Sequence, residues 1–352
     1  AIAIETTNVC NANCVFCGYQ HQSRFRKKRG VMNQEIFERA VQQCRGWGVK
    51  GLDFTPLVGD ALLDPGIVER LEMAKKLGYE TEIFDGQFDA ALQYSQIEDV
   101  LAGGQFVGMI VAPNDSVGIA GAFEQVIAAG VPIGTVLFPV GPELNTLEPQ
   151  VEGITVTAAS PPVPGAEHQA KLAAEHCADK NPCNVVIIIG AKIFPFDNLR
   201  LETFQRVLAE HDNINVVAVG EGWYAPDPSL KAMTDILQAN SDVHVVLSNA
   251  DQHLVGVEIA LDAAGYKPAD LYLAGGGAAQ IAIDAIREGR WDATLAYFPK
   301  TMGALAMEQI ANAIEGKPVT NAINMDTAGP IEAMITGEVL AANPDFVAEW
   351  EQ

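Results

Sequence analysis

Short apolar runs alternate with stretches of helical periodicity along the chain. Strands are predicted over residues 1–7, 50–56, 79–84, 107–113, 131–138, 153–160, 183–190, 214–220, 243–249 and 270–277. In the segments between them apolar residues recur every three or four positions, which predicts helices. These cover residues 33–48, 64–78, 91–104, 117–130, 199–211, 229–240 and 252–265. Repeated βα units imply an α/β protein with parallel, Rossmann-like sheets covered by helices on both faces.

The alternation is interrupted between Pro139 and Pro164, where Pro, Gly and Glu are frequent. We interpret this stretch as a crossover from one α/β lobe to a second. The predicted first lobe comprises residues 49–160 and 298–325, and the second comprises 161–297 and 326–352. Residues 1–48 then form an appended βα unit. Two lobes joined by several crossings form a hinged clamp that can close on a ligand.

Composition excludes some classes of function. The 352 residues are 49% hydrophobic and 19% charged, as in globular proteins, and a net charge of −23 argues against general nucleic-acid binding. No apolar run approaches the roughly 20 residues of a membrane span, so we expect no membrane insertion. The first residues lack a basic segment, so we expect no signal peptide in this sequence, while a cleaved one stays open.

The charge is unevenly distributed. Residues 1–50 contain eight Lys/Arg and three Asp/Glu, a net charge of +5. The remainder contains fourteen Lys/Arg and forty-two Asp/Glu, a net charge of −28. Such asymmetry suggests different origins for the two parts. Much of the positive charge lies in the run at 23–30, interpreted as a solvated loop, with an anion contact as the alternative.

Three cysteines lie close together near the N-terminus with C-x₃-C-x₂-C spacing, namely Cys10, Cys14 and Cys17. Thiolates in one tight loop can ligate three irons of a [4Fe–4S] cluster. A zinc site completed by a residue such as His21 is an alternative, as is a loop without metal.

The first 84 residues or so resemble the N-terminal part of a radical S-adenosylmethionine (SAM) enzyme, in "ETTNVCNANCVFCGY" and "GVKGLDFTPLVGDALLDP". The resemblance implies a cluster on the three cysteines with SAM on the fourth iron. It also implies that Phe16 lies beside the adenine, and that Gly59 and Asp60 belong to the motif for the SAM amino group. Further barrel units are not found, so we expect an exposed loop, a labile cluster and no productive SAM cleavage. The strand at 50–56 is expected to take the first place in the first lobe's sheet.

From about residue 80 onward the chain resembles type I periplasmic binding proteins of sugar-importing ABC transporters. The stretches that carry it include "GMIVAPNDSVGIAGAFEQVIAAGVPIGTV" and "VVLSNADQHLVGVEIALDAAG". The resemblance implies a sugar-like ligand, an ABC permease as partner and a periplasmic or extracytoplasmic location. A functional cluster motif would instead indicate the cytoplasm. It further implies a local disulfide between Cys177 and Cys183, with two free core cysteines as the alternative.

Ligands of such sheets bind beyond the carboxyl ends of the strands. Sugar sites combine aromatic faces with planar polar groups. Candidate aromatic residues there are Phe196, Trp223 and Tyr297, with Phe194 and Tyr224 beside them, and candidate polar residues are Asp115, Asp197, Asn198, Asn249 and Asp251. Core packing is the alternative for each aromatic residue, and helix capping is the alternative for Asp115. His253, at a helix start, is interpreted as structural.

Some positions depart from the family's sugar clamp. Leu137 and Phe138 stand where many members have Asp-Arg, Asn198 where an Arg is common and Gly277 where an Asp is common. The predicted function is therefore solute binding without catalysis, with the ligand left open. The alternatives are a radical SAM or cluster-binding enzyme, and a chimera that retains neither activity.

Overall fold

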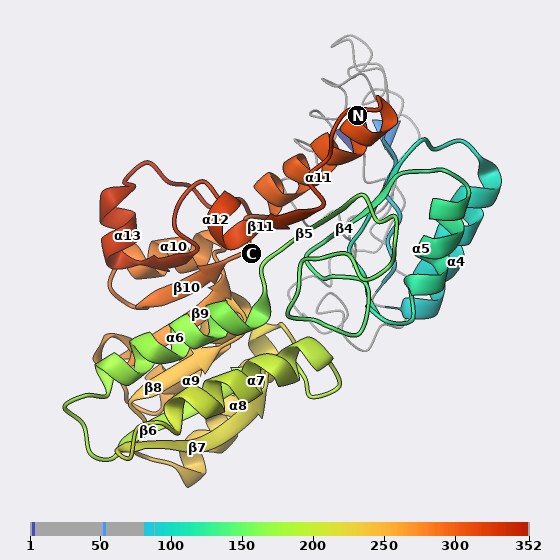
Figure 1. Cartoon of the computed structure of the whole chain (residues 1–352). Helices are drawn as coiled ribbons and strands as arrows, with labels where there is room; N and C mark the ends of the chain where they lie inside the picture. Colours follow the sequence, from blue (N-terminus) through green and yellow to red (C-terminus); the bar gives the residue numbers. More distant parts are fainter. Residues whose placement is uncertain (1, 4–51, 54–80, 88, 351–352) are drawn as a thin grey trace, which may run out of the picture.

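The computed structural model describes residues 2–3, 52–53, 81–87 and 89–350. The described chain forms a two-lobed α/β fold, as predicted, with one wholly or mainly parallel sheet in each lobe (Figure 1). Lobe 1 is built on a four-stranded sheet and lobe 2 on a six-stranded sheet. None of the helices in the described part of the chain is long and apolar enough to cross a membrane.

The lobe 1 sheet has the strand order β11-β5-β4-β3, with all neighbours parallel. Its strands are β3 (Met109–Val111), β4 (Ile133–Val136), β5 (Val156–Ala159) and β11 (Ala322–Asn324). Helices α4 (Ala90–Gly103) and α5 (Ala120–Ala128) pack together, and α11 (Pro299–Ile314) packs on β3, β4 and β5. A core around Ile133, Phe123 and Val126 joins α5 to the sheet.

The lobe 2 sheet has the order β12-β10-β9-β8-β6-β7. Its parallel strands are β6 (Cys183–Ile189), β7 (Ile214–Glu221), β8 (Val245–Ser248), β9 (Tyr272–Gly277) and β10 (Ala293–Ala296). The edge strand β12 (Met334–Thr336) is antiparallel to β10. The continuous apolar run of β6 is almost wholly buried, which is typical of a central parallel strand covered on both faces.

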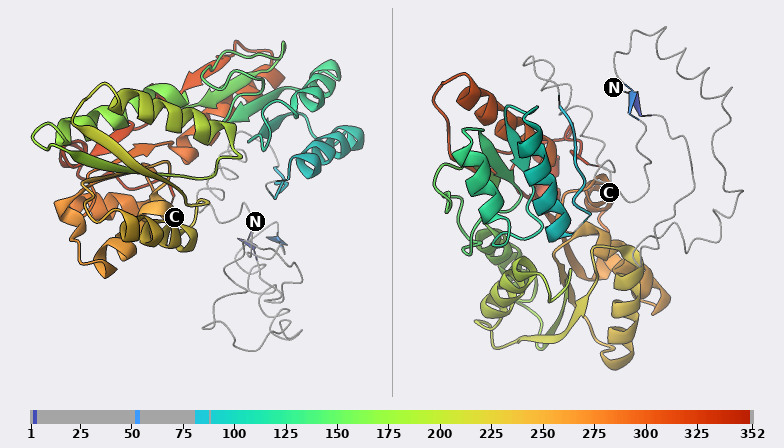
Figure 2. Two further views of the ribbon diagram at one scale, coloured as in Figure 1. Left: turned by 90° about the horizontal axis from the view of Figure 1, so that it is seen from below. Right: turned by 90° about the vertical axis from the view of Figure 1, so that its right-hand side faces the viewer.

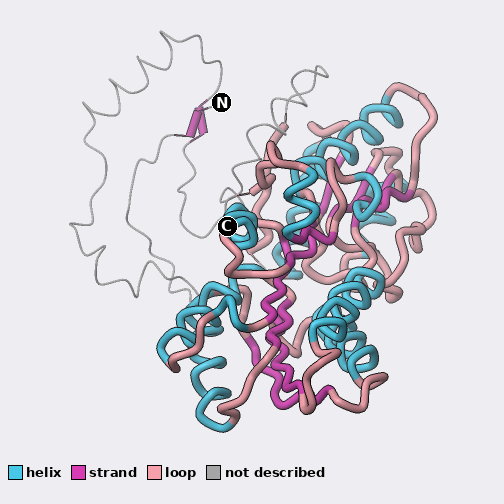
Figure 3. The backbone as a smooth tube through the Cα atoms, turned by 90° about the vertical axis from the view of Figure 1, so that its left-hand side faces the viewer, coloured by secondary structure: helices cyan, strands magenta, loops and turns pink. Residues whose placement is uncertain are grey.

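Helices cover both faces of the lobe 2 sheet (Figures 2 and 3). One layer contains α6 (Pro162–His176) and α7 (Pro195–Leu208), and the other contains α8 (Pro226–Ala239), α9 (Asp251–Ala263) and α10 (Gln280–Arg287). Helices α8 and α9 approach closely at Gly256, where an added Cβ would lie 2.1 Å from the Pro226 carbonyl oxygen. Only glycine fits there.

Within the described residues, the chain crosses from one lobe to the other in the segment from β5 to α6, in the segment from β10 to α11, and again after β11. The last passage enters α12 (Met325–Ala328), which precedes β12, and α13 (Gly337–Ala342) follows. A short 3₁₀ helix, Pro268–Asp270, precedes β9. The passages bring Ser160, Phe298 and Asp326 to the junction between the lobes.

The structure corrects two expectations about the start of lobe 1. Leu52–Asp53 (β2) pairs in parallel with Ile2–Ala3 (β1) in a separate two-stranded sheet, and does not join the lobe 1 sheet. Consecutive βα strands commonly pair with each other, and here β2 takes its parallel neighbour from the preceding unit. The described part of the strand predicted at 79–84, residues 81–84, has no regular structure, and Ile83 and Phe84 are exposed.

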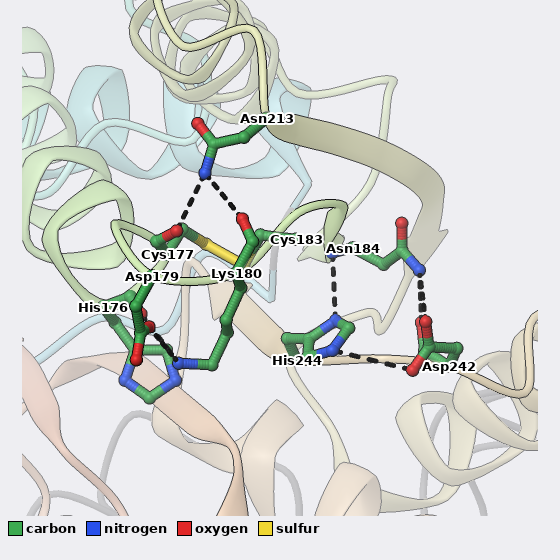
Figure 4. Close-up of a disulfide and its surroundings, with 9 residues drawn as sticks. All are labelled: His176, Cys177, Asp179, Lys180, Cys183, Asn184, Asn213, Asp242 and His244. Carbon is green, nitrogen blue, oxygen red and sulfur yellow. Dashed lines mark hydrogen bonds and ion pairs between the residues drawn. A yellow bond between two sulfur atoms is a disulfide. The ribbon is translucent and has the colours of Figure 1, made fainter.

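The predicted disulfide between Cys177 and Cys183 is confirmed (Figure 4). It joins the end of α6 to the start of β6, and both cysteines are fully buried. The Asn213 side-chain amide donates 2.8 Å hydrogen bonds to the carbonyl oxygens of Cys177 and Lys180 in the same loop. The bridge therefore lies at the amino end of the lobe 2 sheet, the end opposite the loops that follow its strands.

Candidate functional site

The carboxyl ends of the lobe 2 strands carry a cluster of polar side chains that is unusual in its burial. Asp197, Arg200, Ser248, Asn249, Asp251 and His253 are each at most 3% exposed. They come from the starts of α7 and α9 and from the end of β8. Buried polar groups need hydrogen-bond partners, so the partners of each side chain show which are engaged within the protein and which are not.

Asp197 organises this cluster. Its Oδ1 accepts hydrogen bonds from the Tyr224 hydroxyl at 2.5 Å and from the Asn249 side-chain amide at 2.7 Å. Its Oδ2 accepts from the Ala191 backbone N–H at 2.8 Å. Burial raises the pKa of Tyr224, and the neighbouring Asp197 charge acts in the same direction. Both carboxylate oxygens are thus engaged inside lobe 2, where they hold the loops after β6, β7 and β8 together.

His253 supports the same loops. Its Nε2 accepts from the Tyr224 backbone N–H at 2.9 Å, so Nδ1 carries the proton and faces the Ser248 hydroxyl at 2.8 Å. Burial lowers the pKa of His253 to about 3, which keeps the ring neutral. Tyr224 and the preceding Trp223 have positive φ angles of 52° and 49°, an uncommon backbone conformation that these contacts help to hold. The structural interpretation of His253 agrees with this geometry.

Asp251 is a second buried carboxylate with internal partners. The Thr294 hydroxyl donates to Oδ1 at 2.7 Å, and the Ala279 N–H donates to Oδ2 at 2.9 Å. Burial raises the pKa of Asp251 to about 6, with the hydrogen bonds acting in the opposite direction. The carboxylate therefore joins the segments after β8 and β9 to a residue within β10.

Arg200 differs from these residues because its hydrogen-bonding groups are not all engaged within the described part of the chain. It is 3% exposed, and its guanidinium carbon lies 4.8 Å from the centre of the Phe196 ring and 5.2 Å from that of Tyr297. Its Nε and Nη2 are buried and have no hydrogen-bond partner among the described residues. These two nitrogens form one edge of the planar fork, a geometry suited to two neighbouring oxygen atoms.

Sequence reasoning did not select Arg200, although a signal was present. Phe196, Arg200 and Phe204 are spaced four residues apart, so an arginine occupies the apolar stripe of α7. An arginine in a buried stripe needs a partner that the stripe itself does not supply.

Asn249 also keeps one group unengaged. Its Oδ1 is buried without a hydrogen-bond partner in the described part of the chain, while its amide nitrogen is held by Asp197. Gly276 lies between Asn249 and Tyr297, since a Cβ added there would be 2.5 Å from the Asn249 carbonyl oxygen and 3.6 Å from the Tyr297 hydroxyl. Burial raises the pKa of Tyr297, and the nearby Arg200 opposes the shift.

Lobe 1 and the crossing segments close this region from the other side. The ring of Phe138, just after β4, lies edge-on to the Phe196 ring at 4.8 Å, which makes an aromatic contact between the lobes. Asp326, in the third crossing, is partly buried. Burial raises the pKa of Asp326, and the Ser160 hydroxyl and the Arg200 charge act in the opposite direction. Arg200 therefore lies near the place where the crossings meet.

An open pocket of about 400 Å³ lies between the lobes beside this region. Lobe 1 contributes residues of the loop after β4, and lobe 2 contributes the outer face of α7: Pro142, Glu143, Leu144, Asn145, Pro195, Asn198, Leu199 and Glu202. The volume falls in the range of small-molecule sites. Of the residues predicted from the sequence, Asn198 lines this pocket, with its amide donating to the Lys192 carbonyl oxygen at 2.8 Å.

The structure brings most of the remaining predicted residues together. Phe196, Asp197, Asn249, Asp251 and Tyr297 converge at the lobe 2 strand ends, and Trp223 lies beside them, 40% exposed, with its ring edge-on to Phe194. Asp115 is separate, on an exposed lobe 1 turn, where its Oδ1 accepts from the N–H groups of Val117 and Gly118.

The predicted cluster and SAM residues lie outside the described residues: Cys10, Cys14, Cys17, Phe16, Gly59 and Asp60. Within residues 2–3, 52–53, 81–87 and 89–350, no group of three or more His, Cys, Asp or Glu is arranged to hold a metal ion.

The sequence is similar to those of known binding proteins. Residues 71–318 match the family described as periplasmic binding protein domain. The ribose import binding protein of Bacillus subtilis is 27% identical over 257 residues, covering 71% of this chain and 77% of that protein. The D-apiose import binding protein of Actinobacillus succinogenes is 27% identical over 194 residues, covering 55% of this chain and 59% of that protein.

Solved structures agree in fold. A periplasmic solute-binding protein from Actinobacillus succinogenes with bound D-allose superimposes with a TM-score of 0.69 at 21% identity, covering 79% of this chain and 93% of that one. A solute-binding protein from Bacillus halodurans with bound myo-inositol gives 0.67 at 23% identity, covering 80% and 93%. Together with the match over residues 71–318, the two-lobed fold shows that this chain belongs to the periplasmic binding protein domain family.

Proposed function

We propose that the protein binds a sugar or a sugar-like polyol between its lobes, without chemical change to the ligand. The observation that carries this proposal is the unengaged edge of Arg200, two buried N–H groups held between the rings of Phe196 and Tyr297. A buried donor without a partner costs about 1–3 kcal/mol, so a ligand that supplies the acceptor recovers that free energy on binding.

The chemistry around Arg200 suits a polyol. Hydroxyl oxygens can accept from Nε and Nη2 of Arg200, and a hydroxyl proton can be donated to the free Oδ1 of Asn249. The aromatic rings of Phe138 and Phe196 offer apolar surface to the C–H groups of the same ligand. The ligands named for the relatives, ribose, D-apiose, D-allose and myo-inositol, are all of this class.

We further propose that the protein acts outside the cytoplasm and delivers its ligand to an ABC permease. The Cys177–Cys183 disulfide supports this location, because structural disulfides persist in oxidising compartments. The relatives named as import binding proteins support the role of the permease.

The [4Fe–4S] cluster and its SAM stay predictions, because their residues lie outside the described part of the chain. Anaerobic iron and sulfide analysis, with SAM cleavage measured in the wild type and in Cys14→Ala, tests them separately from sugar binding. Cleavage that disappears in the variant would make the enzyme hypothesis primary.

Isothermal titration with D-ribose, D-allose and myo-inositol tests the proposed function. We expect at least one to bind, and Arg200→Met to lose most of that affinity without loss of stability in the unliganded protein. Arg200→Met also removes two buried nitrogens that have no hydrogen-bond partner among the described residues, and with them the free-energy cost of burying them unengaged. The control is Arg206→Met on the same helix, where an exposed arginine pairs with Glu167 and Glu210. No binding by the wild type, or equal binding by Arg200→Met, contradicts the proposal.

A further inference from the structure

The chain continues beyond α13 as a segment of irregular structure that crosses from lobe 2 to the first turn of α11. We call residues 343–350 the C-terminal strap. The strap is tied to α10 at several points. Arg287 Nη2 donates to the carbonyl oxygens of Pro344 and Phe346 at 3.1 and 2.7 Å, and the Ala348 N–H donates to Gln280 Oε1 at 3.1 Å. These contacts make the strap part of lobe 2.

Glu349 then reaches a helix that belongs to lobe 1. Its Oε2 accepts from the Thr301 backbone N–H at 2.8 Å, and its Oε1 accepts from the Thr301 hydroxyl. Thr301 is the third residue of α11, which packs on the lobe 1 sheet (Figure 1). The N-cap residue of α11, Phe298, provides no side-chain cap and has a φ of 49°. Glu349, 48 residues further along the chain than Thr301, thus supplies the capping carboxylate that the residue before α11 does not provide.

Trp350 reaches the other side of the same junction. Its Nε1 donates to the Gly277 carbonyl oxygen at 2.8 Å, and its own carbonyl oxygen accepts from the Gln280 N–H at 3.0 Å. A Cβ added to Gly277 would lie 2.5 Å from the Trp350 ring, so the ring packs against the backbone at the end of β9. The adjacent Gly276 is the residue that lies between Asn249 and Tyr297.

The strap therefore contacts two segments that carry the candidate site, without any of its own side chains among the site residues. One is the end of β9, through Trp350. The other is the passage Tyr297–Phe298 into α11, through Glu349, and the Phe298 ring also lies edge-on to Phe346 of the strap at 6.3 Å.

We propose that Glu349 and Trp350 are positioning residues for ligand binding. Through Thr301 and Gly277 they set the angle between α11 and lobe 2, and with it the relative position of the two lobes and of Tyr297 and Asn249. A ligand held between lobes binds more tightly when the lobes are already oriented for it, because less freedom is lost on closure. Loss of the Glu349 contact should leave both lobes folded but let them sample a wider range of separations.

The ligand-independent test measures the separation of the lobes. Spin labels on ketone-bearing amino acids at the exposed positions 124 on α5 and 231 on α8 avoid labelling the cysteines. In the unliganded protein we expect Glu349→Ala to broaden the distance distribution, and Thr301→Val, which keeps the N–H, to broaden it less. The matched control is Asp345→Ala, an exposed carboxylate of the same strap. A distribution in Glu349→Ala identical to that of the wild type overturns the proposal.

The ligand-dependent test rests on the proposed function. With the tightest-binding ligand among D-ribose, D-allose and myo-inositol, Glu349→Ala should weaken binding by about threefold to tenfold. A change of this size in affinity lies within the range obtained when the free energy of a lost helix cap is converted into a ratio of dissociation constants. Trp350→Phe, which keeps the ring and loses the N–H, should weaken it less. A lower melting temperature with unchanged affinity and unchanged distances would show a merely structural strap. If the wild type binds none of these sugars, the proposed function fails and the distance measurement alone decides about the strap.

Discussion

The two lobes consist of the same kind of βα unit, but the carboxyl ends of their strands differ in chemistry. In lobe 2 these ends carry buried polar side chains whose hydrogen bonds link loops distant in sequence, such as Asp197 to Asn249. In lobe 1 the loop after β3 presents an exposed Asp115 bonded to its own backbone, and the loop after β4 presents the ring of Phe138. On the proposed function, this difference assigns the polar contacts with the ligand at the strand ends to lobe 2, with Phe138 of lobe 1 as apolar cover.

Within lobe 2 the buried polar groups fall into two sets. Asp197, Asp251 and His253 have partners inside the protein for their ring nitrogens or carboxylate oxygens, and so they form a framework. Arg200 and Asn249 each keep atoms without a partner in the described chain. Replacing a framework residue should therefore reduce stability, whereas replacing Arg200 should reduce binding alone.

The largest effect is expected for Asp197→Ala. The change leaves the Tyr224 hydroxyl, the Asn249 amide and the Ala191 N–H without their acceptor in a buried region. We expect a loss of about 3–5 kcal/mol in the free energy of unfolding, measured by urea denaturation. The control is Glu202→Ala, an exposed carboxylate of the same helix. Equal stability of the two variants would show that Asp197 is not part of a framework.

A pH-dependent effect is expected from Asp251. Its pKa is raised to about 6 by burial, from an ordinary value of 3.8, so the folded chain keeps a proton that the unfolded chain has lost. The stabilising contribution of this group is full below pH 4 and is lost as pH rises through 6. Over that range the loss amounts to about 3 kcal/mol.

Urea denaturation of the wild type and of Asp251→Asn between pH 4 and pH 7 measures this contribution. The stability of the variant relative to the wild type should rise with pH. The comparison is needed because His253 also makes stability depend on pH, in the opposite direction. Its pKa is lowered to about 3 in the folded protein, so stability falls as pH decreases below 6.5. Asp262→Asn, an exposed position of the same helix, should run parallel to the wild type. A parallel curve for Asp251→Asn would refute the assignment.

The disulfide should contribute to stability but not to binding. It closes a loop with a sequence separation of 6, which corresponds to about 2 kcal/mol in the loop-entropy account. The double variant Cys177→Ala, Cys183→Ala should lose that amount in chemical denaturation and keep its ligand affinity, because the bridge lies at the amino end of β6. A loss of affinity in the folded double variant would place the disulfide in the binding mechanism.

The smallest effect is expected in lobe 1. Asp115→Ala removes an acceptor for two backbone N–H groups of an exposed turn, and should cost about 0.5–1 kcal/mol of stability. Ligand affinity measured by calorimetry should not change. A tenfold weaker affinity would give lobe 1 a polar role and break the contrast between the lobes.

Much of the fold could be predicted because apolar periodicity reports directly on burial. The run of β6 appears where the sequence indicates it, and so does the disulfide implied by the family resemblance. The helix that follows β6 is also present, but it begins at Pro195, four residues before its predicted start. The partner of a strand is less predictable, since backbone hydrogen bonding is nearly independent of sequence. The run at 50–56 therefore fits two sheets equally well, and in the structure Leu52–Asp53 pairs with Ile2–Ala3.

The candidate site could be predicted in place but not in detail. Loops after parallel strands converge, so Asp197, Asn249 and Tyr297 were found from their positions in the chain. Their hydrogen-bond partners depend on contacts between residues far apart, such as the 52-residue separation of Asp197 and Asn249. Sequence position alone cannot show that both oxygens of Asp197 are engaged, or that Arg200 in an apolar stripe keeps a free edge.

A crystal structure of the protein with the tightest-binding of D-ribose, D-allose and myo-inositol tests the central claim most directly. The account predicts ligand oxygen atoms within hydrogen-bond distance of Nε and Nη2 of Arg200 and of Oδ1 of Asn249, with the Phe138 and Phe196 rings against the ligand. A ligand bound elsewhere, with both atoms of that Arg200 edge still unengaged, would contradict the assignment of polar recognition to lobe 2.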